Sequence, residues 1–261
     1  MKIEFLGTGA ADWSIKNRVE GAEFRRFSSA LIDDELLIDP GPHIFDYAER
    51  AGKPDLFDGV RNIIVTHSHG DHFNANTVAK LCVGRPCTIW ADGTVIRPLM
   101  AALGNETAQQ IDFRPLVSRK PTPIGEYLIT PLRSNHATDN PGEQTLNYIV
   151  ERAGKRIFYG LDSGWIMYDS FCEIRKFRFD AMVFEATIGD VPDDDRIFGH
   201  TSLEMIEIML RSLRRLKVYD ADSRIIISHM ARTLHTPHAQ LEERCRPLGI
   251  IPAYDGMVAE I

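Results

Sequence analysis

The stretch Thr66-His67-Ser68-His69-Gly70-Asp71-His72 directly follows the apolar run Asn62-Ile63-Ile64-Val65. It holds three imidazoles and one carboxylate, and both groups are common ligands of divalent metal ions. On an extended segment, side chains two residues apart point the same way. We therefore expect His67 and His69 to bind one metal ion together.

The remaining two candidate ligands of this stretch stand just before a predicted helix. The sequence pattern predicts that helix over 73–83, so the turn into it would direct Asp71 and His72 toward a second point close to the first. Four ligands shared between two points predict a two-metal site rather than one closed structural site. The alternative interpretation is a polar turn at the end of a strand.

The order His-x-His-x-Asp-His resembles the signature of the metallo-β-lactamase superfamily, and the resemblance extends from Phe5-Leu6-Gly7-Thr8-Gly9 to the last predicted strand. It implies an α/β fold, the four-layer αββα sandwich, with 1–261 as one hydrolase domain. The family takes three further ligands from strand ends later in the chain, in the order His, Asp, His. Here the matching positions are His136, Asp162 and His229, each after a β-branched or aromatic run.

The resemblance also implies how the ligands are divided between two ions. His67, His69 and His136 would bind one ion; Asp71, His72 and His229 would bind the other; Asp162 would bridge the two, which would lie about 3.5–4 Å apart with a hydroxide between them. The expected cofactors are two divalent ions, Zn²⁺ or Mn²⁺, with iron as a further option. Taken alone, His136 and His229 are also compatible with core histidines, and Asp162 with a helix N-cap or turn residue.

Two more elements suggest which reaction the site performs. Gly199-His200-Thr201-Ser202 resembles an element of RNase Z-like and phosphoribosyl cyclic phosphate phosphodiesterase-like enzymes. There the histidine protonates the leaving oxygen or stabilises transition-state charge, so we expect His200 and the ligand Asp71 to be catalytic. The alternative is that His200 caps the next helix or packs beside it. Arg25 and Arg26 are candidate substrate ligands, because guanidinium groups match phosphate oxygens; two solvated loop arginines are the alternative.

The spacing of the candidate ligands indicates which branch of the superfamily the chain resembles. RNase Z carries a tRNA-binding arm between the third His and the bridging Asp, whereas here His136 and Asp162 are only 26 residues apart. Tyr254-Asp255-Gly256-Met257 and Arg25-Arg26 resemble the cyclic phosphate phosphodiesterase instead. That enzyme's cysteine cluster is missing, because residues 10–28 contain no Cys.

The resulting prediction is a binuclear metal-dependent phosphodiesterase that acts on a small or cyclic phosphodiester. A lactonase or thioesterase on the same scaffold is the first alternative, because both reactions use the same kind of nucleophile. An RNase Z-like endonuclease without the arm is the second. A metal-dependent sensor or scaffold without turnover is the third.

The amino-acid composition limits the classes of partner that the chain is expected to bind. The chain has 261 residues, 44% of them hydrophobic, and a formal net charge of −7, which argues against general nucleic-acid binding. Met1-Lys2-Ile3-Glu4-Phe5-Leu6 is typical of a strand rather than a signal peptide, and no apolar run approaches the ~20 residues of a membrane span. We expect a cytoplasmic enzyme with a small-molecule substrate and no membrane partner. The resemblance also suggests a homodimer.

The chain alternates between predicted strands and helices. Strands are expected at 2–6, 29–33, 36–39, 62–66, 87–91, 126–132, 146–151, 156–161, 180–184, 224–228 and 257–261. Helices are expected at 43–51, 73–82 or 83, 94–103, 169–176, 202–216 and 237–246. Thr201-Ser202-Leu203-Glu204 resembles a capping box, and 119–123 is expected to be a surface loop.

Overall fold

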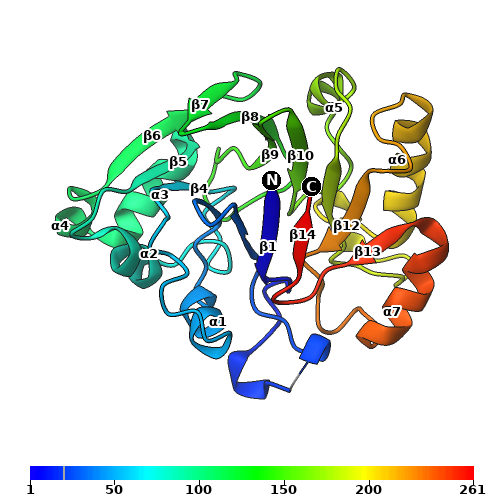
Figure 1. Ribbon diagram of the computed structural model, residues 1–261, viewed down its shortest axis with the longest axis horizontal. Helices are drawn as coiled ribbons and strands as arrows, with labels where there is room; N and C mark the ends of the chain where they lie inside the picture. Colours follow the sequence, from blue (N-terminus) through cyan, green and yellow to red (C-terminus); the bar gives the residue numbers. More distant parts are fainter. Residues whose placement is uncertain (20) are drawn as a thin grey trace.

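The computed structural model describes residues 1–19 and 21–261, which form two seven-stranded sheets packed face to face (Figure 1). The first sheet has the order β14-β1-β2-β3-β4-β5-β6 and the second β13-β12-β11-β10-β9-β8-β7. The strands of the first sheet are β1 (Lys2–Gly7), β2 (Ser29–Ile32), β3 (Leu36–Ile38), β4 (Asn62–Ile64), β5 (Thr88–Asp92), β6 (Asp112–Leu116) and β14 (Val258–Glu260). Those of the second are β7 (Thr122–Ile124), β8 (Tyr127–Arg133), β9 (Leu146–Arg152), β10 (Lys155–Gly160), β11 (Ala181–Glu185), β12 (Arg224–Ser228) and β13 (Ile250–Pro252).

Both faces of each sheet are buried, and alternate residues along a strand face different layers. In β1, Phe5 lies in the core between the sheets, while Leu6 packs on the outer face. In β10, Tyr159 points into the same central core and Phe158 points outward. This explains why the strands read as nearly continuous apolar runs.

Helices cover the outer face of each sheet (Figure 1). The first sheet carries α1 (Ile44–Arg50), α2 (Ala75–Cys82), α3 (Gly93–Leu103) and the short α4 (Asn105–Ala108). The second carries α5 (Tyr168–Ile174), α6 (Leu203–Arg215) and α7 (His238–Cys245). Four 3₁₀ turns complete the regular elements: η1 (Ile15–Asn17), η2 (Gly21–Glu23), η3 (Asp195–Phe198) and η4 (Arg246–Leu248). The arrangement confirms the predicted αββα sandwich.

The strand directions determine where the candidate ligands meet. β3 to β6 are parallel, as are β10 to β13, and β8 runs in the same direction as β10 because both are antiparallel to β9. Carboxyl ends of such strands lie at one edge of a sheet. The two edges are joined by the hydrogen bond from the Leu146 amide to the Thr66 carbonyl and by a bridge between Gly9 and Met230. The loops that follow the carboxyl ends of these strands, from both sheets, therefore lie next to one another.

Some predicted boundaries were wrong. The helix expected from residue 73 begins at Ala75, because the side chain of Asn74 accepts a hydrogen bond from the Thr77 amide and caps it. α6 begins after Ser202, which accepts from the Met205 amide, so the expected capping box does not form: Glu204 is one residue too early. No helix in the described part of the chain is both long and apolar enough to span a bilayer.

Candidate metal centre

Seven His and Asp side chains converge where the loops of the two sheets meet. Their ligand atoms form two groups, and within each group these atoms lie within 4.8 Å of one another. The first group is His67, His69 and His136, and the second is Asp71, His72, Asp162 and His229. The structure thus brings together all seven residues that the sequence selected as metal ligands, and it groups Asp162, the expected bridge, with the second set.

The distances within these groups fit metal coordination. In the first group, His69 Nδ1 lies 3.0 Å from His67 Nε2 and 3.3 Å from His136 Nε2. In the second, His72 Nε2 and His229 Nε2 are 3.2 Å apart. Ligands at about 2.0–2.1 Å from a tetrahedral zinc ion lie about 3.3–3.4 Å from each other, which is close to this spacing. The donor set therefore fits divalent ions without rearrangement of the chain.

Asp162 lies between the two groups. Its Oδ2 is 3.4 Å from His67 Nε2 and 2.5 Å from His72 Nε2, while Oδ1 is 3.2 Å from His229 Nε2. Oδ1 is buried and has no hydrogen-bond partner within the described residues, as expected of an oxygen placed for a cation. The rival role as a helix N-cap does not apply, since Met167 holds that position on α5.

The backbone is unusual at three residues of the centre. Asp39, Asp162 and His229 have φ angles of +57°, +44° and +54°, in the left-handed region that few non-glycine residues adopt. Asp39 and His229 directly follow β3 and β12, and Asp162 comes two residues after the end of β10. Such strain persists only where the surroundings enforce it, and it gathers at functional sites.

The turn that carries Asp71 and His72 is held by the segment 39–41. The Asn74 amide donates to the Pro40 carbonyl, and the Gly41 α-carbon lies directly against the Asp71 carbonyl. A Cβ on residue 41 would lie only 2.5 Å from that carbonyl oxygen, so glycine is needed for this close approach. The local sequence Asp39-Pro40-Gly41 therefore helps to set the position of two candidate ligands.

Hydrogen bonds orient most of the imidazole rings through the nitrogen that faces away from the centre. His136 Nδ1 is 3.2 Å from the Gly199 carbonyl, and His229 Nδ1 is 2.9 Å from Thr187 Oγ1. A carbonyl can only accept, so His136 carries its hydrogen on Nδ1 and leaves the Nε2 lone pair for an ion. Such outer contacts fix the tautomer and the direction of a metal ligand.

Asp39 orients His72 in the same way. Asp39 Oδ2 lies 2.8 Å from His72 Nδ1 and accepts from Thr66 Oγ1 at 2.9 Å, while Oδ1 accepts from the Thr66 amide at 2.8 Å. The carboxylate is completely buried. The structure thus places Asp39 in contact with the candidate ligand His72.

Replacing Asp39 with asparagine should weaken metal binding about 10- to 100-fold. An amide has one acceptor oxygen and one NH₂ donor, so it cannot accept all three hydrogen bonds that Asp39 now accepts. The measurement is a titration against a chromophoric chelator. Asp112→Asn, at an exposed position in β6, is the matched control. Unchanged affinity in Asp39→Asn would show that Asp39 does not orient His72 for an ion.

Protonation within the cluster follows from burial and from the opposite charges packed together. Burial, and next the charge of His72, lower the pKa of His67 well below its usual range, so this ring is neutral. Burial raises the pKa of the Asp71 and Asp162 carboxyls, but neighbouring histidines lower both well below the usual range. Burial lowers the pKa of His72, and the three surrounding carboxylates raise it by more. Neutral imidazoles and ionised carboxylates are the forms that bind metals, and His72 would release a proton when an ion binds.

A cavity of about 240 Å³ opens beside the cluster. Its lining includes Asp71, His136, Asp162, His200 and His229, together with Asp12 from the segment after β1 and Arg196 from η3. Arg196 holds Asp194 through two hydrogen bonds of 2.7 and 2.8 Å. Sequence reasoning did not select Asp12 or Arg196, since nothing in their local sequence distinguishes them from ordinary loop residues.

His200 lies at the edge of the cluster, held by Glu185. His200 Nδ1 is 3.0 Å from Glu185 Oε1 and 3.5 Å from Asp162 Oδ1. Burial lowers the pKa of His200, but the hydrogen bond and charge of Glu185, with the charges of Asp162 and Asp71, raise it to about 9. His200 does not cap α6, because Ser202 does. The alternative of a helix-capping histidine is therefore wrong.

Glu185 is the main residue that sequence reasoning missed. It is buried, and its carboxylate also accepts hydrogen bonds from the Thr201 amide at 2.9 Å and the Thr187 amide at 2.7 Å. It ends β11, between the strands that lead to Asp162 and His229. A charged residue at the end of the apolar run 181–184 could have indicated this role.

Arg25 and Arg26 lie outside the cavity beside the cluster. Arg25 Nη1 donates to Thr8 Oγ1 at 2.7 Å and to the Ala253 carbonyl at 2.5 Å, and Nη2 to His238 Nδ1 at 3.0 Å. Arg26 pairs with Asp46 and Asp255. Neither of these candidate substrate ligands lines the cavity beside the cluster, because these contacts direct both guanidinium groups elsewhere. His238, which contacts Arg25, is also buried.

Comparisons with known proteins agree with this fold. The family model of the β-lactamase superfamily domain matches residues 34–230. Zn²⁺-bound PqqB from Methylobacterium extorquens is 16% identical with a TM-score of 0.73, covering 100% of both chains. A diphosphatase of the PhnP family is 18% identical with a TM-score of 0.71, over 100% of this chain and 97% of that one. The short form of human tRNase Z is 20% identical with a TM-score of 0.67, over 100% and 99%.

No curated protein matches the chain at a significant level. The structural likenesses show the fold alone, but the family model covers well over half of the sequence and includes all seven residues of the cluster. The chain therefore belongs to the β-lactamase superfamily of metal-dependent hydrolases.

Proposed function

We propose that the protein is a binuclear metal-dependent phosphodiesterase that acts on a small or cyclic phosphodiester. The observation that carries this proposal is the pair of ligand groups joined by Asp162, with the Glu185–His200 pair beside them. His67, His69 and His136 would hold one Zn²⁺ or Mn²⁺ ion, and Asp71, His72 and His229 the other, with Asp162 between them. When bound, the two ions would neutralise the phosphate oxygens and make a water between them acidic enough to attack at neutral pH.

Within this proposal, His200 supplies the proton that the leaving oxygen needs. Its Nδ1 contacts Glu185, so Nε2 is the nitrogen left to donate to a substrate. Glu185 is a positioning residue: it fixes the plane of the ring and stabilises its charged form. Asp71 lines the cavity and is only slightly exposed, so its carboxylate is placed to accept a proton from the attacking water.

The dimensions of the site favour a small substrate. The cavity of about 240 Å³ is at the low end of pockets that bind small molecules. The 26 residues from His136 to Asp162 are largely taken up by β9 and β10 and their connection, which leaves no segment for an arm that grips an RNA. A diphosphatase and a tRNase Z among the similar structures support phosphorus–oxygen chemistry as the reaction class.

The test compares three ester classes on one preparation. The purified chain, loaded with Zn²⁺ or with Mn²⁺, is assayed on bis(p-nitrophenyl) phosphate, a lactone and a thioester. The proposal predicts that the phosphodiester is cleaved, that a chelator abolishes cleavage, and that adding the metal back restores it. Turnover of the lactone or thioester without phosphodiester cleavage would favour the alternative hydrolases.

A further inference from the structure

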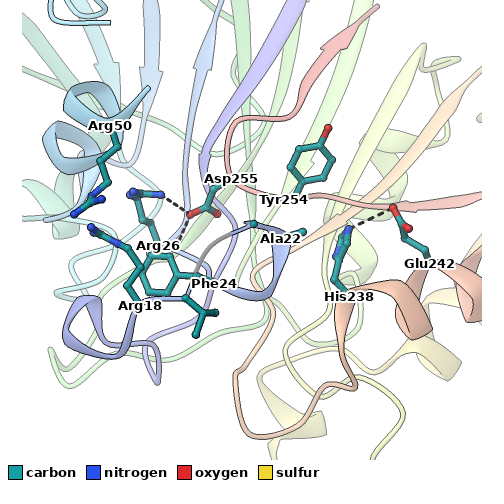
Figure 2. A pocket seen from close by; sticks show the side chains of 11 residues that line it. Arg18, Ala22, Phe24, Arg26, Arg50, His238, Glu242, Tyr254 and Asp255 are labelled. Carbon is teal, nitrogen blue, oxygen red and sulfur yellow. Dashed lines mark hydrogen bonds and ion pairs between the residues drawn. The ribbon is translucent and has the colours of Figure 1, made fainter. Parts of the chain in front are cut away.

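A second cavity, of about 510 Å³, lies apart from the metal centre and shares no lining residue with the cavity there. Figure 2 shows three arginines at one end and His238 with Glu242 at the other, with Tyr254 and Asp255 between them. The remaining lining is Val19, Gly21, Ala22 and Phe24. A cavity of this size, with charged groups at opposite ends, is typical of a small-ligand site.

One carboxylate behind the cavity wall, that of Asp46, contacts all three arginines. Asp46 Oδ2 is 2.6 Å from Arg18 Nη2 and 2.7 Å from Arg26 Nη2, and Asp46 Oδ1 is 3.5 Å from Arg50 Nε. Asp46 itself does not line the cavity. It therefore holds together, at the cavity wall, three guanidinium groups that all line the cavity.

The side chains of this cluster that the structure describes carry more positive than negative charge. Among them, three guanidinium groups face two carboxylates, Asp46 and Asp255, and Asp255 Oδ2 also accepts from the Arg26 amide at 2.7 Å. Each guanidinium has five N–H donors, many more than two carboxylates can accept. The Arg50 side chain is 59% exposed, so a ligand can reach it. In a chain of net charge −7, this end of the cavity is a local anion site.

The opposite end of this cavity presents hydrogen-bond acceptors. His238 Nδ1 is 3.0 Å from Arg25 Nη2, and since arginine only donates, Nδ1 accepts and Nε2 carries the hydrogen. That N–H faces Glu242 Oε1 at 3.4 Å. The Glu242 carboxylate is 50% exposed and keeps lone pairs for other donors. The Tyr254 ring lies 5.9 Å from the His238 ring, centroid to centroid. Carboxylates in such positions accept hydrogen bonds from hydroxyl groups.

We propose that this cavity binds a phosphate monoester with a hydroxylated body. The phosphate would lie among Arg18, Arg26 and Arg50, which offer several donors to its oxygens. The body would lie along Phe24 and Ala22, with its hydroxyls toward Glu242. The site is separate from the proposed phosphodiesterase centre and does not depend on that reaction.

The test is calorimetric titration of the full, metal-loaded chain with inorganic phosphate, glucose 6-phosphate and glucose. We expect glucose 6-phosphate to bind more tightly than phosphate, and glucose not to bind measurably. Arg18→Ala/Arg50→Ala should weaken binding of both anions about tenfold or more. Glu242→Gln should weaken glucose 6-phosphate alone, because phosphate does not reach that end.

Arg114→Ala is the matched control, since Arg114 is an exposed arginine in β6 paired with Asp112. Phosphate that binds only at the metal centre would persist in Arg18→Ala/Arg50→Ala, and unchanged affinity in that variant would overturn the proposal. A glucose 6-phosphate affinity unaffected by Glu242→Gln would overturn the assignment of the hydroxylated body. Absence of binding by the wild type would overturn both.

Discussion

Asp162→Ala should abolish stable loading of two metal ions and lower kcat/KM for phosphodiester cleavage about 10³-fold or more. The Asp162 carboxylate contacts His67 of the first group and His72 and His229 of the second, so its loss removes an anionic group that lies beside both. Without it, two cations a few ångströms apart would repel each other with little compensation. Metal content by mass spectrometry and activity on bis(p-nitrophenyl) phosphate measure the two effects.

The control for this variant is Asp222→Ala, at an exposed position in the turn before β12. It removes a carboxylate of the same kind far from the cluster and should leave metal content and activity unchanged. Circular dichroism separates loss of ions from loss of fold. An Asp162→Ala protein that keeps two ions and normal turnover would refute the bridging role.

His200→Ala should leave the metal content near the wild-type value and lower kcat by about 10²–10⁴-fold for a phosphodiester with a poor, alkyl leaving group. An alkoxide leaves poorly unless it is protonated, and His200 is the imidazole at the cavity that is not in either main ligand group. A p-nitrophenolate leaves readily without protonation. The loss on bis(p-nitrophenyl) phosphate should therefore be clearly smaller.

This difference between leaving groups separates catalysis from packing. Equal losses on both substrates would indicate that His200 only supports the structure of the site. Glu185→Gln keeps the size of the side chain but removes the charge that stabilises a protonated His200, and one of its two terminal atoms becomes a donor that can no longer accept. It should reproduce the leaving-group dependence with a smaller loss. If the protein cleaves a lactone or a thioester, the rate of that cleavage should be the same in His200→Ala as in the wild type.

The cluster could be predicted to a large extent from sequence, for local and for topological reasons. His67, His69, Asp71 and His72 lie in one strand–turn–helix, so short-range geometry brings them together. The distant ligand Asp162 follows an apolar strand, and strands that run in one direction end at one edge of the sheet. The family signature then supplied the order of the distant ligands.

The side on which a loop residue lies could not be predicted in this way. Arg25 and Arg26 precede β2 in a loop, and nothing nearby in sequence tells which cavity they face. For Arg26, Asp46 from α1 and Asp255 from the turn before β14 decide it, through ion pairs over 20 and 229 residues of sequence. For Arg25, the contacts with Thr8, Ala253 and His238 decide it. Glu185 was missed for a related reason: its partners Thr201 and His200 come from a different loop.

The sequence-based prediction also failed for three strands at the edges of the sheets. β6, β7 and β13 were not predicted, and each of them contains a proline: Pro115, Pro123 and Pro252. Proline lacks the amide hydrogen that a central strand needs, but an edge strand pairs on one side only. The prediction of a loop over 119–123 was accordingly wrong for Thr122 and Pro123, which begin β7 at the edge of the second sheet.

The most direct test of the central claim is the number of metal ions that one chain holds. Native mass spectrometry of the wild type, after loading with Zn²⁺ or Mn²⁺ and removal of excess metal, should give two ions per chain. His136→Ala, which removes a ligand from the first group only, should give mainly one. A wild type that holds a single ion, or none, under both loading conditions would contradict a binuclear centre.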